Sequence, residues 1–127
     1  MDVSRFLDVA FTLDEAGLVW KPSLGDEISH RESPESIAIL VSPEALKPEE
    51  LRLTYFWLPT FDQLMMQLEA RQIILFHAGL HVSPEEVCYQ TVIQDGDLSI
   101  ESKADSLRTA MAISLLKVLD GKKKAIH

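Results

Sequence analysis

The sequence predicts an α+β fold in a single domain over residues 1–127: a mainly antiparallel sheet of about five or six strands with three helices, the last packed on the sheet. Three observations lead to this prediction. Short apolar runs alternate with turn residues. Asp95-Gly96 lies between two extended runs, which is typical of a two-residue hairpin turn. The chain closes in a long helix that is apolar on more than one face.

Apolar residues at helical spacing predict a first helix over residues 1–15, with Gly17 as the residue that ends it. An alternative makes residues 9–13 a strand. Residues 22–36 are rich in Ser, Pro, Gly and acidic residues and predict a long loop or a ragged hairpin.

Residues 37–41 are continuously apolar and predict a central strand. Ser42-Pro43-Glu44 predicts one helical turn after that strand, and residues 83–86 repeat the pattern. Residues 52–58 alternate between two faces and are good strand formers, so they predict a further strand.

The second helix is predicted to begin at Thr60, because Thr60 and Gln63 have the spacing of a capping box. A strand over residues 72–77 follows, closed by Ala78-Gly79. Residues 87–93 and 98–101 flank the turn at Asp95-Gly96 and predict a hairpin.

The closing helix is predicted to start at Ser102, with Asp105 completing a capping box, and to end at Gly121. Its apolar surface is wide, so either the sheet or a second chain should cover it. Ile113 and Leu116 on this helix are therefore candidate interface residues.

Tyr55 and Trp57 belong to an aromatic set that one packed face does not require, and they are the other two interface candidates. The competing interpretation places these rings in the core.

Composition excludes several classes of protein. Hydrophobic residues make up 46% of the chain and charged residues 25%, which is ordinary for a globular protein. No apolar run approaches a membrane span, and no secretory signal is evident. Cys88 is the single cysteine. We therefore expect a cytoplasmic protein without a membrane partner.

The net charge of −8 disfavours binding to nucleic acid. The basic tail at residues 122–127 is instead typical of a solubilising helix end that matches the helix dipole.

His77 and His81, with Cys88 nearby, are the only candidates for metal binding or catalysis. Ala78-Gly79 lies between the two histidines at a strand end, where their spacing does not bring them together. Cys88 has apolar neighbours, as a buried thiol does. Neither a nucleophile elbow nor a phosphate-binding loop nor a dinucleotide fingerprint is present, so no catalytic residue and no cofactor is predicted.

The segments Trp20-Lys21-Pro22, Leu58-Pro-Thr-Phe-Asp-Gln-Leu64 and residues 104–119 carry a resemblance. Together they are similar to short uncharacterised proteins of phage, prophage and bacterial genomes, in which a small β unit precedes an Ala- and Leu-rich closing helix. The resemblance implies a bacterial or phage setting and no particular activity.

The function that these observations favour is a non-enzymatic module that binds a protein partner or forms a homo-oligomer. The alternative is a small enzyme or a metal- or ligand-binding domain that uses His77, His81 and Cys88, with the acidic loop around Asp26. A third hypothesis, an acidic inhibitor that mimics DNA, rests on the net charge alone.

Overall fold

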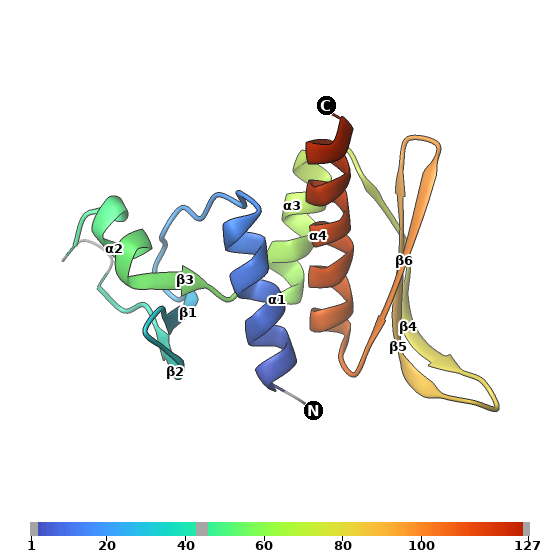
Figure 1. The fold of residues 1–127 in the computed structure, drawn as a ribbon, viewed down its shortest axis with the longest axis horizontal. Coiled ribbons are helices and arrows are strands. Elements are labelled where there is room, and N and C mark those ends of the chain that lie inside the picture. Colours follow the sequence, from blue (N-terminus) through green and yellow to red (C-terminus); the bar gives the residue numbers. More distant parts are fainter. Residues whose placement is uncertain (1–2, 43–45, 126–127) are drawn as a thin grey trace.

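Two three-stranded antiparallel sheets and four helices form the part of the chain that the computed structural model describes, residues 3–42 and 46–125 (Figure 1). The strand orders are β2-β1-β3 and β4-β5-β6. The predicted α+β class is confirmed, with the six strands divided between two sheets. In chain order the elements are α1 (Val3–Glu15), β1 (Glu27–His30), β2 (Ser33–Ile39), α2 (Pro48–Thr54), β3 (Tyr55–Trp57), α3 (Phe61–Ala70), β4 (Ile74–Val82), β5 (Val87–Asp95), β6 (Leu98–Ala104) and α4 (Leu107–Ala125).

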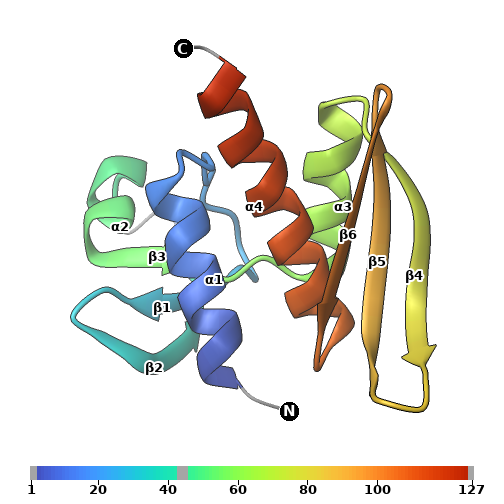
Figure 2. The same ribbon diagram turned by 45° about the vertical axis from the view of Figure 1, so that its right-hand side comes forward.

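Helix α4 lies at the centre of the molecule. The β4-β5-β6 sheet covers one side of it, and α1 and α3 pack on its other sides (Figures 1 and 2). The helix therefore buries residues around most of its circumference: Ala110, Met111, Ala112, Ser114, Leu115 and Val118. The wide apolar surface seen in the sequence is covered largely by the chain's own helices and sheet.

The start of α4 differs from the prediction. Ser106, and not Ser102, caps the helix, because its Oγ accepts a hydrogen bond from the backbone N–H of Thr109 at 3.1 Å. Ser102 lies in β6, which continues to Ala104 paired with Tyr89 of β5. The capping-box spacing is present at Ser102, but the ladder hydrogen bonds of the hairpin hold that residue in a strand.

Three buried hydroxyl groups join α4 to the sheet. Ser114 on the helix lies 2.9 Å from the Thr91 hydroxyl of β5 and donates to the Ser102 hydroxyl of β6 at 2.8 Å. Thr91 also donates to the carbonyl of Ala110 at 3.2 Å. Each of the three hydroxyls therefore has at least one hydrogen-bond partner inside the core.

Arg108 joins α4 to the other side of the molecule. Its guanidinium donates to the carbonyls of Leu58 and Pro59 at 2.7 and 2.8 Å, and it lies 3.3 Å from a carboxylate oxygen of Glu27. The same group lies 4.1 Å from the centre of the Phe6 ring, within cation–π range.

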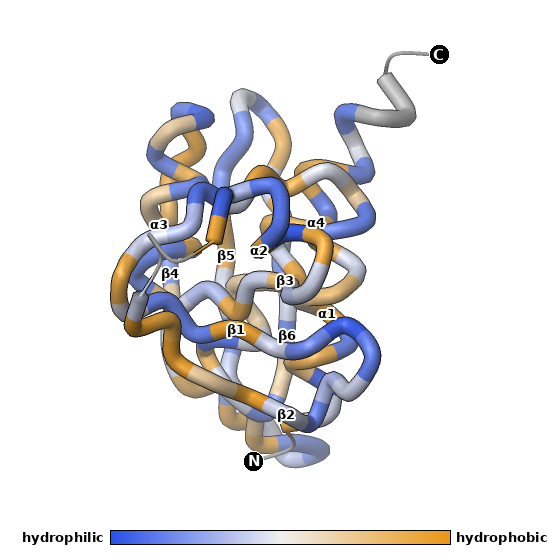
Figure 3. The backbone as a smooth tube through the Cα atoms, turned by 90° about the vertical axis from the view of Figure 1, so that its left-hand side faces the viewer, coloured by the Kyte–Doolittle hydropathy of each residue, from blue (hydrophilic) through white to orange (hydrophobic). Residues whose placement is uncertain are grey.

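Residues 22–36, predicted as a long loop or a ragged hairpin, contain β1 and the beginning of β2, which pair as an irregular antiparallel hairpin. Strand β1 has one apolar residue, Ile28, and the signal for a strand is correspondingly weak. Residues 37–41 do not form a central strand. Strand β2 (Figure 3) is an edge strand that ends at Ile39, with Ile37 and Ile39 exposed, whereas the next residue, Leu40, is buried in the core.

Residues 52–58, predicted as a strand, are divided between α2 and β3. Pro48 at the helix start and acidic residues in the first turn favour a helix there, and this local chemistry outweighs the alternation of side chains. Only Tyr55–Trp57 pairs with β1.

The strand predicted over residues 72–77 begins later and runs on through Ala78-Gly79 to Val82. Residues 83–86 form no helical turn. They close the β4–β5 hairpin instead, with the N–H of Ser83 donating to the carbonyl of Glu86 at 2.8 Å. The helical turn predicted at Ser42-Pro43-Glu44 falls on residues 43–45, outside the described ranges.

Three local predictions are confirmed. Helix α1 is a single helix that is followed by Gly17 at φ +97°, so the alternative strand over residues 9–13 does not form. Thr60 and Gln63 make the predicted capping box of α3. The β5–β6 hairpin turns at Gly96, at φ +60°.

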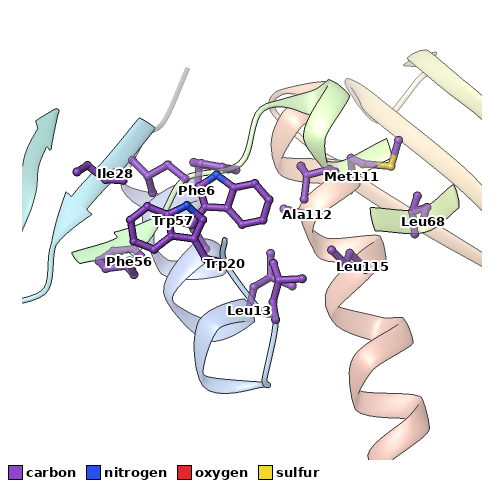
Figure 4. Packing of buried hydrophobic residues seen from close by; sticks show 14 of the residues in the cluster. Phe6, Leu13, Trp20, Ile28, Phe56, Trp57, Leu68, Met111, Ala112 and Leu115 are labelled. Carbon is purple, nitrogen blue, oxygen red and sulfur yellow. The ribbon is translucent and has the colours of Figure 1, made fainter. Parts of the chain in front are cut away.

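One cluster of buried apolar side chains extends across both sheets and the three longer helices. Figure 4 shows its two ends: aromatic rings of α1, β3 and the segment before β1 lie on one side, and Leu68, Met111 and Leu115 lie between α3 and α4 on the other.

Replacing Ser106 by Ala removes the cap of the central helix, so we expect a loss of about 1–2 kcal/mol in the free energy of unfolding. Chemical denaturation followed by circular dichroism measures this loss. Ser99→Ala, at an exposed position of β6, is the matched control and should change stability by less than about 0.5 kcal/mol. Equal effects of the two substitutions would contradict the assignment of Ser106 as the cap.

Candidate functional site

The predicted metal and catalytic candidates lie on β4 and β5. His81 is directly opposite Cys88 in the antiparallel register, whereas His77 is opposite Val92. Along a strand, residues four apart are separated by roughly 13 Å, so the two histidines do not converge on one ion. Among the described residues, no group of three or more His, Cys, Asp and Glu side chains could hold a metal.

The charges near His81 form a solvated ion-pair cluster. Lys103 Nζ lies 2.9 Å from Glu86 Oε1, and His81 Nε2 lies 3.7 Å from the same oxygen. The hydrogen bond from Lys103, with its positive charge, lowers the pKa of Glu86, and the hydrogen bond to Glu86 raises the pKa of Lys103. Both side chains are exposed to solvent, so these shifts describe a surface ion pair.

Three of the four predicted interface residues, Tyr55, Trp57 and Leu116, belong to or pack against the core of their own chain. Trp57 is buried in the core, and Leu116 packs against it. Tyr55 is half-buried, with its ring edge-on to His30 at 5.5 Å. Ile113 is half-buried on α4. Trp57 therefore agrees with the competing interpretation, which placed these rings in the core, and Tyr55 agrees with it in part.

An open cleft of about 510 Å³ lies beside the buried Asp26. Asp26 Oδ2 accepts from Trp20 Nε1 at 2.9 Å and from the backbone N–H of Ser23 at 3.0 Å, and Oδ1 accepts from Gln63 Nε2 at 2.9 Å. Asp26 thus fastens the segment before β1 to α3. Its carboxylate is occupied by internal donors, which argues for a structural role.

The most unusual surface is the free edge of β4. This nine-residue strand is the outermost strand of its sheet, and no helix or loop covers its edge in Figure 2. Four of its large apolar residues are more than half exposed: Ile74 at 62%, Phe76 at 77%, Leu80 at 56% and Val82 at 66%. We call these four residues the β4 edge patch.

The backbone of the same strand also lacks partners on its outer side. An antiparallel ladder alternates between residues that bond to the neighbouring strand and residues that face away. Because Ser83 and Glu86 are hydrogen-bonded at the hairpin end, alternation directs the N–H and C=O groups of Ala78, Leu80 and Val82 to the free edge. No described residue bonds to them across that edge.

The opposite edge of the sheet, β6, has a different character. Charged residues Glu101 and Lys103 lie along it, and Lys117 of α4 donates to the carbonyl of Glu101 at 2.6 Å. Charged side chains and a covered acceptor are common ways of protecting an edge strand. Within the described strands of this sheet, the β4 edge combines exposed apolar residues with free backbone groups, whereas the β6 edge does not.

The sequence prediction missed the β4 edge because it ended the strand at Ala78-Gly79. The signal that could have found it is the alternation of Ala78, Leu80 and Val82, which keeps a period of two past Gly79. Gly79 fits within the strand because the His77 ring lies where a side chain would otherwise be: an added Cβ would be 3.3 Å from His77 Cε1.

Comparisons of the chain with protein-family models, with curated proteins and with solved structures found no match. None of the helices in the described ranges combines the length and the hydropathy that a bilayer-spanning segment needs. Function is therefore inferred from the geometry of the described residues.

The structural role of Asp26 can be tested by Asp26→Asn. The amide replaces one acceptor oxygen by a donor, so at least one of the three internal donors must lose its bond, and we expect a loss of about 1–3 kcal/mol in the free energy of unfolding. Urea denaturation gives this value, with Asp120→Asn on the exposed face of α4 as the matched control. Unchanged stability of Asp26→Asn would show that the network does not hold the fold.

Proposed function

We propose that the protein is a non-enzymatic module that associates with other protein chains, above all with copies of itself, through the free edge of β4. The observation that carries this proposal is the β4 edge patch on a long, uncovered edge strand. Monomeric proteins protect such edges, because an exposed apolar edge strand is a template for pairing with another chain.

The energetic argument favours an apolar contact. Burying a large aliphatic or aromatic side chain contributes roughly 1.5–3 kcal/mol, and the patch offers four of them per copy. Association costs an estimated 4–15 kcal/mol in lost translational and rotational freedom, so the side chains and the new backbone hydrogen bonds must act together. The net result is an association of moderate strength.

The net charge sets the salt dependence of this association. Each copy carries −8, so two copies repel one another at long range. At physiological ionic strength the screening length is about 8 Å, and added salt weakens the repulsion without weakening the apolar contact. Self-association through the patch should therefore strengthen as salt is added, the opposite of what an ion-pair interface would show.

The interface that supports the proposal differs from the one expected from the sequence. Tyr55, Trp57 and Leu116 pack within or against the core of their own chain, and Ile113 is half-buried. The proposal for His77, His81 and Cys88 as an enzyme or metal site gains no support from the described geometry. The β4 edge carries the proposal because it remains unpartnered after the chain has folded.

The test is Leu80→Lys, which places a charge in the middle of the patch without touching the buried core. We expect the wild type to form an oligomer in sedimentation velocity over a concentration series, and Leu80→Lys to weaken that association at least about tenfold. Leu53→Lys is the matched control, since Leu53 is 79% exposed on α2 and lies outside the patch.

Two results would overturn the proposal. One is a wild type that stays monomeric at the highest concentration and salt. The other is equal association of Leu80→Lys and the wild type, when circular dichroism shows that both proteins are folded.

A further inference from the structure

The cleft beside Asp26 is lined by two separate parts of the chain, the segment before β1 and α3, together with Trp57 of β3. Three large apolar side chains in this lining, Val19, Leu24 and Met66, are each more than half exposed. The volume of about 510 Å³ is within the range of roughly 300–1,000 Å³ that is typical of small-ligand sites. The lining residues all lie outside β4, so the cleft is separate from the β4 edge patch.

The carboxylate and amide oxygens in this lining already accept hydrogen bonds from their own chain. Asp26 accepts three, and it is 5% exposed. Gln63 Oε1 accepts from the backbone N–H of Thr60 at 2.9 Å, and Gln67 Oε1 accepts from Arg71 Nη1 at 2.8 Å. A ligand in the cleft therefore meets side-chain acceptors that are engaged.

Side-chain donors in the same lining are available to a ligand. Lys21 Nζ and Gln67 Nε2 bond to no acceptor among the described residues. Trp57 is 9% exposed, and its Nε1 is the one buried side-chain nitrogen or oxygen without a hydrogen-bond partner in the described part of the chain. A buried N–H without a partner is unfavourable, and an acceptor on a ligand would remove that cost.

The exposed charge at the cleft is positive, although the chain as a whole carries −8. Lys21 is exposed and forms no ion pair with a described residue. Arg71 adds a second positive charge through its two hydrogen bonds to Gln67. Asp26 opposes these charges, but it is buried and its oxygens face internal donors. The arrangement favours an anion over a cation of the same size.

We propose that the cleft binds a small monocarboxylate with an apolar body. Lys21 and Gln67 donate to the carboxylate, and the apolar side chains of the lining contact the body, with the flexible Met66 adapting to its shape. The Trp57 N–H donates to a carboxylate oxygen. Because Trp57 Nε1 is itself covered, the indole or a neighbouring lining side chain shifts slightly when the ligand binds.

Titration of the ¹⁵N-labelled protein with octanoate tests this site. The chain has two tryptophans, so Trp57 and Trp20 each give an indole N–H resonance. We expect the Trp57 resonance to move downfield and to saturate with a Kd on the order of 1 mM, as fits a ligand of about ten non-hydrogen atoms. The Trp20 resonance should move less, because that N–H already donates to Asp26 at 2.9 Å.

Two lysine variants test the role of charge. Lys21→Gln should raise the Kd for octanoate about three- to fivefold, the range for an exposed charge pair. Lys122→Gln is the matched control, because it removes the same charge from an exposed position of α4 outside the cleft, and it should leave the Kd unchanged. Octanol and octylammonium carry the same apolar body without a negative charge and should each bind at least about threefold more weakly than octanoate.

Three results would overturn the proposal: no saturable shift with octanoate, equal affinity for octanoate and octylammonium, or equal effects of the two lysine variants. Binding of octanoate without a shift of the Trp57 resonance would overturn the contact to its N–H. The site is independent of association through β4, so Leu80→Lys should bind octanoate as the wild type does. Failure at the cleft therefore leaves the proposed function standing, and failure of association leaves the cleft site standing.

Discussion

The fold depends on burying α4 from several directions at once. One sheet can cover only one side of a helix, and the remaining apolar surface requires α1 and α3. Because α4 comes last in the chain, the elements around it lack their central support until it docks. Arg108 then joins the helix to β1 and to the segment after β3 through Glu27, Leu58 and Pro59, so one residue links α4 to the first sheet.

Local chemistry in the sequence was enough to predict some elements. The capping box at Thr60 and the turn at Gly96 depend on neighbours a few residues away, and both are confirmed. The first sheet was not predictable in this way. Strand β1 has Ile28 as its one apolar residue, and its pairing with β2 and β3 supplies what its composition lacks. At residues 52–58 the alternation of side chains favoured a strand, whereas Pro48 at the helix start favoured a helix. The helix forms as far as Thr54.

The candidate site was hidden from the sequence for a related reason. Whether an apolar strand is covered or open depends on which elements remain after the core is filled, and spacing along the chain does not report this. The helices pack on α4 and leave β4 as the outermost strand (Figure 2). Of the aromatic residues that suggested an interface, Trp57 is buried and Tyr55 is half-buried. The surface available for binding therefore consists of the apolar residues that stay exposed after the core has formed.

The buried hydroxyls of Thr91, Ser102 and Ser114 have a consequence beyond local stability. Apolar side chains tolerate small displacements, but the buried Ser114 hydroxyl can bond to both Thr91 and Ser102 in one alignment of helix and sheet only. These hydrogen bonds set the position of α4 along the length of the sheet. A partner that adds to the outer edge of β4 would then meet a sheet whose other two strands, β5 and β6, are held in place by the central helix.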